Sequence, residues 1–440
     1  MSRQTPRSSH AESASRRTFL FAMVEGGGNV PAQMSIARRL AGRGHRVHVL
    51  GDPSIAIEAE RAGCSFSTYT RAPRHDMRDP SKDLVRDWEA SSPMAQLRRI
   101  GERLMFGPSE AYARDLLDAI DAVGPDALAI DCLPFGLIVG AEKSGLPAAL
   151  LFHYPYCAPV EGVTPFGLGL RPARGPLGRL RDRFLVAVLK RMFRFGLEPV
   201  NASRRSLGMP ALREVFDQFH ALQRSLVLTS AAYDFVPPAL PYDVRYVGAQ
   251  LDDPAWVAPY APPWPDDDTA PLVLVSLGST FQNQGPTLRR IVEALGQLPV
   301  RALVTLGEQS YDDGLAPPTN VVVVGSAPHA AVLPRASAVI AHGGHGTVMK
   351  ALSHGVPLVC IPFGRDQKDN GARVEVAGAG LSVSPKASSR RIREALRRVL
   401  EEAQFRQGAR RMQATIARET ERDLAIAELE ALSARHPRAC

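Results

Sequence analysis

The densest group of residues that could do chemistry lies in the second half of the chain. An apolar run at 337–341 is followed directly by His342-Gly343-Gly344-His345-Gly346-Thr347, which opens a segment of helical periodicity ending at Gly355. Glycines let the backbone approach a ligand closely, and the first N–H groups of a helix together carry about half a positive charge. Two imidazoles and a hydroxyl add donors there. The pattern predicts a cradle for a phosphate or pyrophosphate, with tight packing alone as the alternative.

In the first half of the chain, two polar residues stand at the carboxyl ends of apolar runs. Asp131 ends the run 127–131, and His153 follows the run 148–152. Ligands of doubly wound sheets bind at the carboxyl ends of strands, so both residues are candidates for taking a proton from an attacking group. Asp131 could instead cap a helix or lie in a surface loop. For His153 the sequence favours a buried, hydrogen-bonded core histidine.

Apolar runs predict the strands that must position these residues, because parallel strands are buried on both faces. In the first half of the chain the runs are 18–24, 46–50, 127–131, 148–152 and 225–229. In the second half they are 272–276, 302–306, 321–325, 337–341 and 358–362. Segments of helical periodicity separate the runs. The alternation predicts an α/β fold of two doubly wound, Rossmann-like domains that face each other across a cleft.

A proline-rich segment at 251–270 separates the two series of strands and predicts a stiff linker. It divides the chain into an N-terminal domain at 17–250, preceded by a disordered tail at 1–16, and a C-terminal domain at 271–415. We expect residues 416–440 to form a helix and tail that could pack back on the N-terminal domain. The sequence Asp266-Asp267-Asp268 lies in the linker and is not expected to bind a metal.

The composition is that of a globular protein, with 45% hydrophobic and 22% charged residues. The formal net charge of +8 suits an anionic small ligand, and the scattered basic residues lack the aromatic interleaving typical of nucleic-acid binding. The five cysteines form no CxxC pair, which predicts reduced thiols and no zinc site. Arg16-Arg17 resembles part of an export signal, but its apolar run stops at Val24. We therefore predict a first strand there and a cytoplasmic protein.

The spacing of further motifs resembles that of the family-1 glycosyltransferases, the UDP-glycosyltransferase superfamily of GT-B fold, especially the bacterial enzymes that modify natural products. In that family an HGG-x-G-[ST] turn is followed by a GVP strand and then by an Asp-Gln pair with a nearby asparagine. The matching residues here are HGGHGT at 342–347, Gly355-Val356-Pro357, Asp366-Gln367 and Asn370. Two upstream segments also resemble donor-side loops of the family: Ser276-Leu277-Gly278-Ser279-Thr280 and Ala327-Pro328-His329.

The resemblance implies a transferase that moves a sugar from a nucleotide-diphosphate sugar with inversion at the anomeric carbon, without a metal or other cofactor. The C-terminal domain would bind this donor, and the N-terminal domain would bind a hydrophobic small-molecule or lipid acceptor. His342 would contact the diphosphate, whereas Asp366 and Gln367 would bind hydroxyls of the sugar. The implied donor-binding residues are Ser279, Thr280, His329, His342, Gly344, His345, Gly346, Thr347, Asp366, Gln367 and Asn370.

Two residues depart from the family where the nucleoside would lie. Lys350 stands where the family often has a glutamate on the ribose hydroxyls, and Ser326 stands where many members stack a tryptophan on the base. The sequence therefore leaves UDP and TDP equally open.

A third departure concerns the general base, which the family places as a histidine in a G-H-x-x-P turn after the first strand. Here the turn reads Gly26-Gly27-Gly28-Asn29-Val30-Pro31, so Asn29 takes the place of the histidine. An amide cannot act as a general base, although Asn29 could cap the following helix and still bind the acceptor. Three interpretations stay open: Asp131 or His153 takes the proton, the acceptor needs little base help as in C- or N-glycosylation, or the protein binds sugar nucleotides without turnover.

Other functions match parts of the sequence. Gly26-x-Gly28 with Asp52 partly matches the dinucleotide site of an oxidoreductase, but Pro31 occupies the position of the third glycine. An epimerase or hydrolase of nucleotide sugars would share the same architecture. Residues 171–194 form a basic amphipathic segment that could lie on an anionic membrane and present a lipid acceptor, although a lid over the acceptor pocket is the more common role. Membrane association is thus not the expected outcome.

Overall fold

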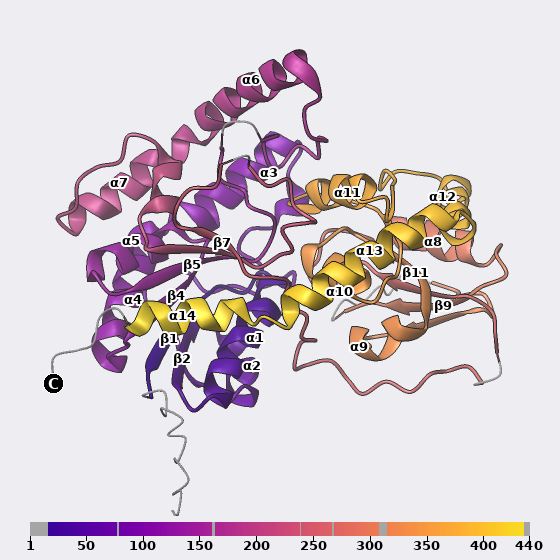
Figure 1. Cartoon of the computed structure of the whole chain (residues 1–440), viewed down its shortest axis with the longest axis horizontal. Helices are drawn as coiled ribbons and strands as arrows, with labels where there is room; N and C mark the ends of the chain where they lie inside the picture. Colours follow the sequence, from indigo (N-terminus) through magenta and orange to yellow (C-terminus); the bar gives the residue numbers. More distant parts are fainter. Residues whose placement is uncertain are drawn as a thin grey trace, which may run out of the picture.

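The computed structural model describes residues 16–76, 79–160, 163–237, 239–265, 268–307 and 315–434. They form two domains side by side, each built on one parallel sheet flanked by helices (Figure 1). The predicted α/β class with two doubly wound domains is confirmed. Most of the predicted N-terminal tail, residues 1–15, lies outside the described residues, as do Asp266, Asp267 and residues 435–440.

The N-terminal sheet has seven parallel strands in the order β3-β2-β1-β4-β5-β6-β7. The strands are β1 (Thr18–Ala22), β2 (Arg46–Gly51), β3 (Ser65–Thr68), β4 (Ala127–Asp131), β5 (Ala148–Phe152), β6 (Arg224–Val227) and β7 (Val244–Tyr246). The central strands β4 and β5 are buried along their whole length, as continuous apolar runs predict. The sequence did not predict β3 and β7, because these short edge strands carry partly exposed polar residues.

The C-terminal sheet has six parallel strands in the order β10-β9-β8-β11-β12-β13. They are β8 (Leu272–Ser276), β9 (Arg301–Thr305), β10 (Val321–Val324), β11 (Ala336–Ala341), β12 (Leu358–Cys360) and β13 (Gly380–Ser382). The order reverses between β8 and β11, just as it reverses between β1 and β4 in the other domain. Loops at such reversal points diverge and leave room for a ligand, so each domain offers one site.

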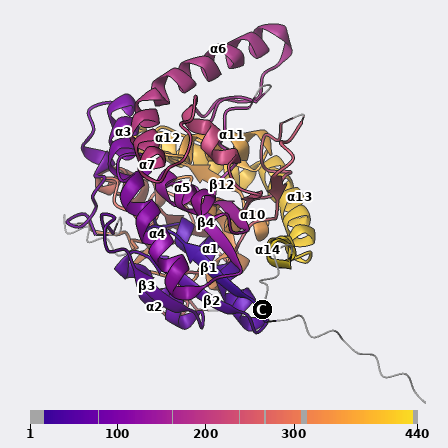
Figure 2. The ribbon, with the colours of Figure 1, turned by 90° about the vertical axis from the view of Figure 1, so that its left-hand side faces the viewer.

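The connecting helices cover both faces of each sheet. In the N-terminal domain they are α1 (Asn29–Gly42), α2 (Ala56–Arg61), α3 (Pro93–Ile100), α4 (Ser109–Val123), α5 (Phe135–Ser144), α6 (Gly175–Phe193) and α7 (Leu197–Ser206). After the linker follow α8 (Gly285–Leu295), α9 (His329–Val332), α10 (His345–Ser353), α11 (Gln367–Val376), α12 (Ser389–Glu401), α13 (Ala403–Thr420) and α14 (Leu424–Ala434). Figure 2 shows α6 along the outer edge of the N-terminal domain, away from both sheets.

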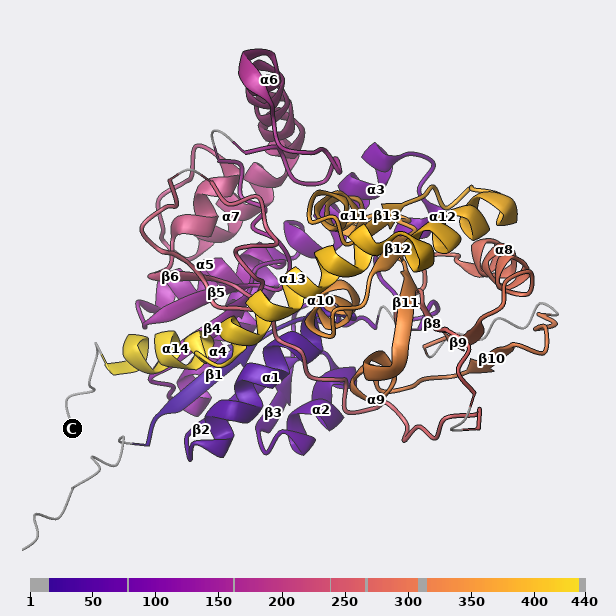
Figure 3. The same cartoon turned by 45° about the vertical axis from the view of Figure 1, so that its right-hand side comes forward.

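The chain returns to the N-terminal domain at its end. Helix α13 belongs to the C-terminal domain and α14 lies on the N-terminal sheet, so the two form a yellow rod across both domains (Figure 3). Ala425, Ile426 and Leu429 are fully buried in the N-terminal core. Arg43 pairs with Asp423 and Glu430 at 3.1 Å each. The sequence placed a boundary after residue 415, which falls inside α13; the chain changes domains between α13 and α14.

Within the part of the chain that the structure describes, no helix combines the length and apolar character needed to span a bilayer.

Candidate functional site

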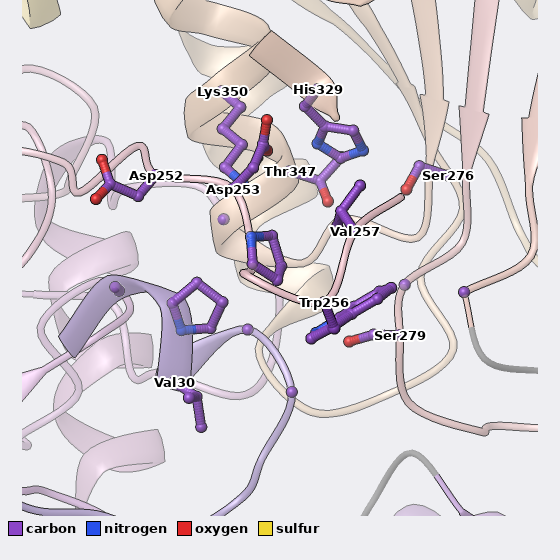
Figure 4. Close-up of a pocket in the computed structure, with 18 of the residues that line it drawn as sticks. Val30, Asp252, Asp253, Trp256, Val257, Ser276, Ser279, His329, Thr347 and Lys350 are labelled. Atoms are coloured by element: carbon purple, nitrogen blue, oxygen red, sulfur yellow. The ribbon is translucent and has the colours of Figure 1, made fainter. Parts of the chain in front are cut away.

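A cavity lies between the domains, where the carboxyl ends of the two sheets face each other (Figure 4). It encloses about 1020 Å³, including its open side. The loop after β1 and His153 at the end of β5 form one wall. The loops after β8, β9 and β10, with the start of α10, form the opposite wall. A third side comes from linker residues between 252 and 257, so both domains and their connection build one site.

The predicted phosphate cradle is the start of α10. The turn is made by Gly343, whose φ is 89°, and by Gly344, which precedes the helix in an extended conformation. The amides of His345, Gly346 and Thr347 come first in the helix and therefore have no partner within it, and all three residues line the cavity. A Cβ added at Gly346 would meet no atom within 4 Å, so the space beside the helix start is open. Such a helix start can hold an anion. The helix begins at His345, later than the sequence predicted, because the residues before it form the turn.

His342 flanks the cradle and does not line the cavity itself. Its ring lies between Gly278 and Gly344: a Cβ on Gly278 would approach the ring Cε1 to 2.9 Å, and one on Gly344 would overlap the ring. Burial lowers the pKa of His342 to about 4, so the imidazole is neutral at pH 7. A contact between His342 and a diphosphate stays a prediction. The two glycines are required because their side chains would displace this ring.

His345 and His329 both line the cavity. The His345 ring points toward the N-terminal domain, where its Nε2 lies 2.8 Å from Thr229 Oγ1. The side chain thus connects α10 to that domain, whereas the His345 amide is part of the cradle. Burial lowers the pKa of His345 to about 3 and that of His329 to about 4, the latter with help from the charge of Lys350. Both rings are neutral at pH 7. Ser279 also lines the cavity.

Asp366, Gln367 and Asn370 do not line the cavity, and their side chains form hydrogen bonds within the protein. Gln367 Oε1 accepts hydrogen bonds from the Phe363 and Gly364 amides at 2.7 and 3.1 Å, and its Nε2 donates to Gln282. Its side chain thus has partners within the protein, and its contact with a sugar hydroxyl stays a prediction. Asn370 Nδ2 donates to Asp366 Oδ2 at 2.7 Å. Burial raises the pKa of Asp366, whereas this hydrogen bond lowers it.

An ion pair beside these residues was not predicted. Arg365 reaches across the domain boundary and donates to both carboxylate oxygens of Asp87, at 2.9 and 3.0 Å. It also donates to Thr280 Oγ1 at 2.9 Å, so Thr280 is held by the protein. Arg365 adopts a φ of 54°, which a bulky side chain rarely does, and Asp87 is buried. The pair holds the loops after β8 and β12 of the C-terminal domain against the N-terminal domain. No local motif signals such a pairing in the sequence.

Asn29 fills the turn of the N-terminal domain with its own side chain. Its Oδ1 accepts from the Gly26 amide at 3.0 Å, and its Nδ2 donates to the Val24 carbonyl and to Asp131 Oδ2 at 2.7 and 2.8 Å. Asn29 is the first residue of α1 and its side chain makes no helix cap, contrary to that expectation. Its partner Asp131 also accepts from Gln33 and, through Oδ1, from the Leu133 amide. Asp131 is fully buried and fully hydrogen-bonded, neither a helix cap nor a surface acid.

His153 lines the cavity from the N-terminal domain and lies beside Asp131. Its Nδ1 lies 3.8 Å from Asp131 Oδ1, and among the described residues this nitrogen has no hydrogen-bond partner. The expectation of a fully hydrogen-bonded core histidine is therefore wrong. Burial lowers the pKa of His153, and the nearby carboxylates of Asp131 and Asp366 partly oppose that shift. A neutral imidazole beside a buried carboxylate can accept a proton and stabilise the resulting charge.

The structure also tests two other uses of these side chains. Asp131, Cys132 and His153 form a group whose potential ligand atoms lie within 4.8 Å of one another. However, both Asp131 oxygens are occupied by amide donors, and burial raises the pKa of the Cys132 thiol, which disfavours the thiolate that a metal needs. Asp52, the candidate ribose acid of an oxidoreductase, accepts the Glu25 and His75 amides at 2.8 and 3.1 Å. Its carboxylate shapes the loop, and no ribose contact is left for it.

Known proteins resemble this chain in sequence and in architecture. Residues 289–432 match the family described as the C-terminal domain of erythromycin biosynthesis protein CIII-like proteins. The chain is 30% identical to 4'-demethylrebeccamycin synthase of Lentzea aerocolonigenes over 408 residues, which cover 89% of this chain and 94% of the relative. It is 32% identical to demethyllactenocin mycarosyltransferase of Streptomyces fradiae over 415 residues, with 90% and 82% covered.

This chain belongs to the bacterial natural-product family-1 glycosyltransferases. The solved structure of the glycotransferase of kitacinnamycin matches it with a TM-score of 0.73 at 21% identity, covering 95% of this chain and 99% of that one. The calicheamicin glycosyltransferase CalG4 matches with a TM-score of 0.65 at 24% identity, covering 96% and 99%. Both support the GT-B fold. The glycosyltransferase transfers a sugar from a nucleotide sugar.

Sequence reasoning missed the residues that line the cavity without belonging to a motif. Glu25 lies in the loop after β1, and its Oε1 accepts the Gly27 amide at 2.7 Å. Asp253 and Trp256 come from the linker, which was predicted only as a spacer. An acid directly after the first strand and a tryptophan in a proline-rich segment are the signals that could have drawn attention to them.

Proposed function

We propose that this glycosyltransferase moves a sugar from UDP- or TDP-sugar to a hydroxyl of a hydrophobic small molecule, with inversion at the anomeric carbon. The observation that carries the proposal is that the α10 amide cradle and the His153 imidazole belong to opposite walls of one cavity. A donor phosphate and an attacking hydroxyl would thus meet between an anion site and a base. Inversion is what the family resemblance implies. A single displacement, which inverts the anomeric carbon, also agrees with one base on one side of the cavity.

The leaving group is a nucleoside diphosphate, and its developing charge would be stabilised by the amides of His345, Gly346 and Thr347. These groups are fixed before the reaction, so they need no reorganisation as the bond breaks. The neutral imidazoles of His329 and His342 lie on the same side and would add hydrogen bonds without a full positive charge. We propose that this cradle replaces the charge neutralisation that a divalent metal supplies in other enzymes.

His153 would take the proton of the acceptor hydroxyl. The hydroxyl oxygen attacks the anomeric carbon, the bond to the diphosphate oxygen breaks, and the proton moves to the imidazole. Asp131 Oδ1, 3.8 Å from Nδ1, would stabilise the imidazolium that forms. Compared with the family pattern, the catalytic histidine would lie at the end of β5 and not in the turn after β1. The aspartate at the end of β4 would be the same. Asn29 would hold Asp131 in place through its amide.

The linker would supply the nucleoside contacts that Lys350 and Ser326 do not provide. Lys350 Nζ donates to Asp253 Oδ1 at 2.7 Å, so Asp253 brings a carboxylate to the position next to the ribose. The Ala258 amide donates to Ser326 Oγ at 3.2 Å, which holds the linker against the strand end where the family has its tryptophan. Figure 4 shows the Trp256 indole extending into the cavity toward Ser279. We propose that this indole stacks on the pyrimidine.

Two solved relatives in fold, VinC and the spinosyn rhamnosyltransferase SpnG, are described in complex with dTDP and thymidine diphosphate. The names of relatives by sequence include a TDP-daunosamine transferase of Streptomyces peucetius. These names support a pyrimidine diphosphate as the donor nucleotide and a natural product as the acceptor for this chain.

Calorimetric titration with TDP, UDP and NAD⁺ tests the donor assignment. We expect micromolar to millimolar binding of at least one pyrimidine diphosphate and none of NAD⁺. Trp256→Ala should weaken nucleotide binding by about tenfold, because base–aromatic stacking contributes about 1–3 kcal/mol. Trp264→Ala is the matched control, since this second linker tryptophan lines a different cavity and lies against Arg301. NAD⁺ binding without pyrimidine binding would overturn the proposal.

Product analysis tests the reaction itself. Incubation with TDP- and UDP-glucose and a panel of planar phenols should give β-linked products by proton NMR, since inversion converts the α-linked donor. Products linked through carbon or nitrogen would favour the variant in which little base help is needed. Hydrolysis of the donor at an equal rate with and without acceptor would argue against a transferase reaction for this chain.

A further inference from the structure

Helix α6 stands away from the body of the N-terminal domain. It follows the long loop after β5, spans Gly175–Phe193, and extends beyond the rest of the molecule in three views (Figures 1, 2 and 3). Asp182 and Phe193 are the buried residues of the helix. Leu189 packs at the margin of the N-terminal core. The helix is thus held mainly by its C-terminal half, and its N-terminal half projects into solvent.

The face of α6 that points away from the protein is apolar. Leu177, Leu180 and Phe184 have exposed fractions of 84%, 64% and 66%. Their spacing of three and four residues places them on one side of a helix, and Asp182 lies about 140° around the helix from Leu177, on the side that is buried. Leu168, 45% exposed, precedes the helix. Soluble proteins usually bury the large apolar side chains of their helices. An exposed row of such side chains therefore needs an explanation.

The same segment carries most of the net positive charge of the protein. Residues 171–194 contain one acidic residue, Asp182, and eight basic ones: Arg171, Arg174, Arg179, Arg181, Arg183, Lys190, Arg191 and Arg194. Eight minus one gives +7, compared with +8 for the whole chain. Asp182 is buried, accepts from Thr164 and Arg181, and therefore adds no negative charge to the outer surface. The exposed apolar face is bordered by arginines.

We propose that α6 docks on an anionic lipid membrane, with Leu177, Leu180 and Phe184 in the boundary between headgroups and acyl chains. A helix of this kind binds in the interface plane through its apolar face, while basic side chains reach the lipid phosphates. An acidic protein would supply the charge, but it would need a groove for a convex row of leucine and phenylalanine side chains. A membrane surface needs no matching shape. The charge and the shape together therefore favour lipid.

Docking at α6 would bring the N-terminal domain to the membrane with a defined orientation. The loop between β5 and α6 is attached to the C-terminal domain: the Gly167 amide donates to Asp369 at 2.8 Å, and Arg171 pairs with Glu375 at 2.7 Å. The His153 end of the same loop lies in the cavity. A hydrophobic compound dissolved in the membrane would then be close to the acceptor side of the enzyme. The docking itself does not depend on the proposed donor or base.

Sedimentation with vesicles tests the proposal. The full chain should bind vesicles of phosphatidylcholine with 30% phosphatidylglycerol, bind pure phosphatidylcholine at least tenfold more weakly, and be released from the anionic vesicles as salt rises from about 0.1 to 0.5 M. A triple change of Leu177, Leu180 and Phe184 to serine should weaken binding at least tenfold. The control triple change of Ile57, Met94 and Val376 to serine removes apolar residues that are 58%, 50% and 50% exposed elsewhere, and should leave binding unchanged.

A second pair of variants separates charge from apolar contact. Arg179→Gln with Arg191→Gln should weaken binding to anionic vesicles about 25-fold, since one basic residue near such a surface contributes about fivefold. The control Arg390→Gln with Arg391→Gln, at the start of α12, should have no effect. Equal melting temperatures would show that the variants fold. No preference for anionic vesicles, equal binding by the serine variant, or binding to soluble polyglutamate in place of vesicles would overturn the proposal.

Discussion

The two domains repeat one device, a glycine-rich turn after a buried strand, and use it in opposite ways. After β1, the Gly26 amide is bound by Asn29, the Gly27 amide by Glu25, and the Glu25 amide by Asp52. After β11, the amides at the start of α10 face the cavity, and no side chain caps the helix. The first turn is thus satisfied by side chains of the N-terminal domain, whereas no side chain caps the helix that follows the second.

From this difference we expect a strand-to-helix turn to bind an anion only when the chain does not supply the acceptors itself. Carboxylates and an amide close the N-terminal turn, so a diphosphate would be repelled there by Glu25 and Asp52. The histidines of the C-terminal turn are neutral, because burial lowers the pKa of His342 and His345. The predictions below test this difference between the two turns, beginning with the largest expected effect.

The strongest prediction concerns the proton acceptor on the N-terminal side. His153→Ala should lower kcat by about 10²–10⁴-fold while the Kd for TDP changes less than threefold, because general-base catalysis is lost and the cradle is intact. His48→Ala, on β2, is the control: its ring bonds Ser65 and Ser67 away from the cavity. Because the pKa of His153 is lowered, kcat/KM in the wild type should stay level down to pH values below 6.5. Undiminished turnover would move the base elsewhere.

A matched pair of substitutions compares the two turns directly. A Cβ added at Gly346 or at Gly28 meets no atom within 4 Å, so aspartate fits at both positions. Gly346→Asp should raise the Kd for TDP at least tenfold, since it places a negative charge in the cradle. Gly28→Asp should change it less than threefold. Calorimetry on both variants decides the comparison, and equal losses would show that the diphosphate lies between the turns and not on α10.

Asn29→Ala should lower the free energy of unfolding by about 1–3 kcal/mol, because it leaves the partly buried Gly26 amide without an acceptor and removes a donor to the buried Asp131. The affinity for TDP should remain unchanged. Urea unfolding followed by circular dichroism measures the first quantity and calorimetry the second. A loss of nucleotide affinity at unchanged stability would mean that the N-terminal turn takes part in donor binding after all.

The smallest expected effect is that of pH on donor binding. The pKa values of His329 and His342 are lowered to about 4 and that of His345 to about 3, so all three stay neutral from pH 5.5 to 8. Affinity for an intact nucleotide sugar, whose phosphates stay ionised in this range, should vary less than twofold. A rise in affinity as pH falls from 7 to 5.5 would reveal a protonated imidazole on the phosphates and contradict the neutral cradle.

Much of the scaffold was predictable because it rests on continuous apolar runs. Strands such as β4, β5 and β8 were located from their letters, whereas the polar or very short strands β3, β7 and β13 were not. The glycine-rich turn before α10 was located because it follows an apolar run and precedes a segment of helical periodicity, and its role as an anion cradle stays a prediction. The roles of Gln367 and His345 could not be predicted, since their partners Gln282 and Thr229 are distant in sequence. The same holds for Arg365, whose partner Asp87 belongs to the other domain.

The placement of α14 has a consequence for how the molecule is made. Leu429 and Leu432 of α14 complete the hydrophobic core of the N-terminal domain. They are nevertheless synthesised after the whole C-terminal domain. At about 5–20 residues per second, roughly ten to forty seconds separate synthesis of the linker from that of α14. During this time the first domain exposes an uncovered apolar face. The domain that is synthesised first is therefore finished last, and a nascent chain interrupted before residue 424 would present a surface for chaperones or aggregation.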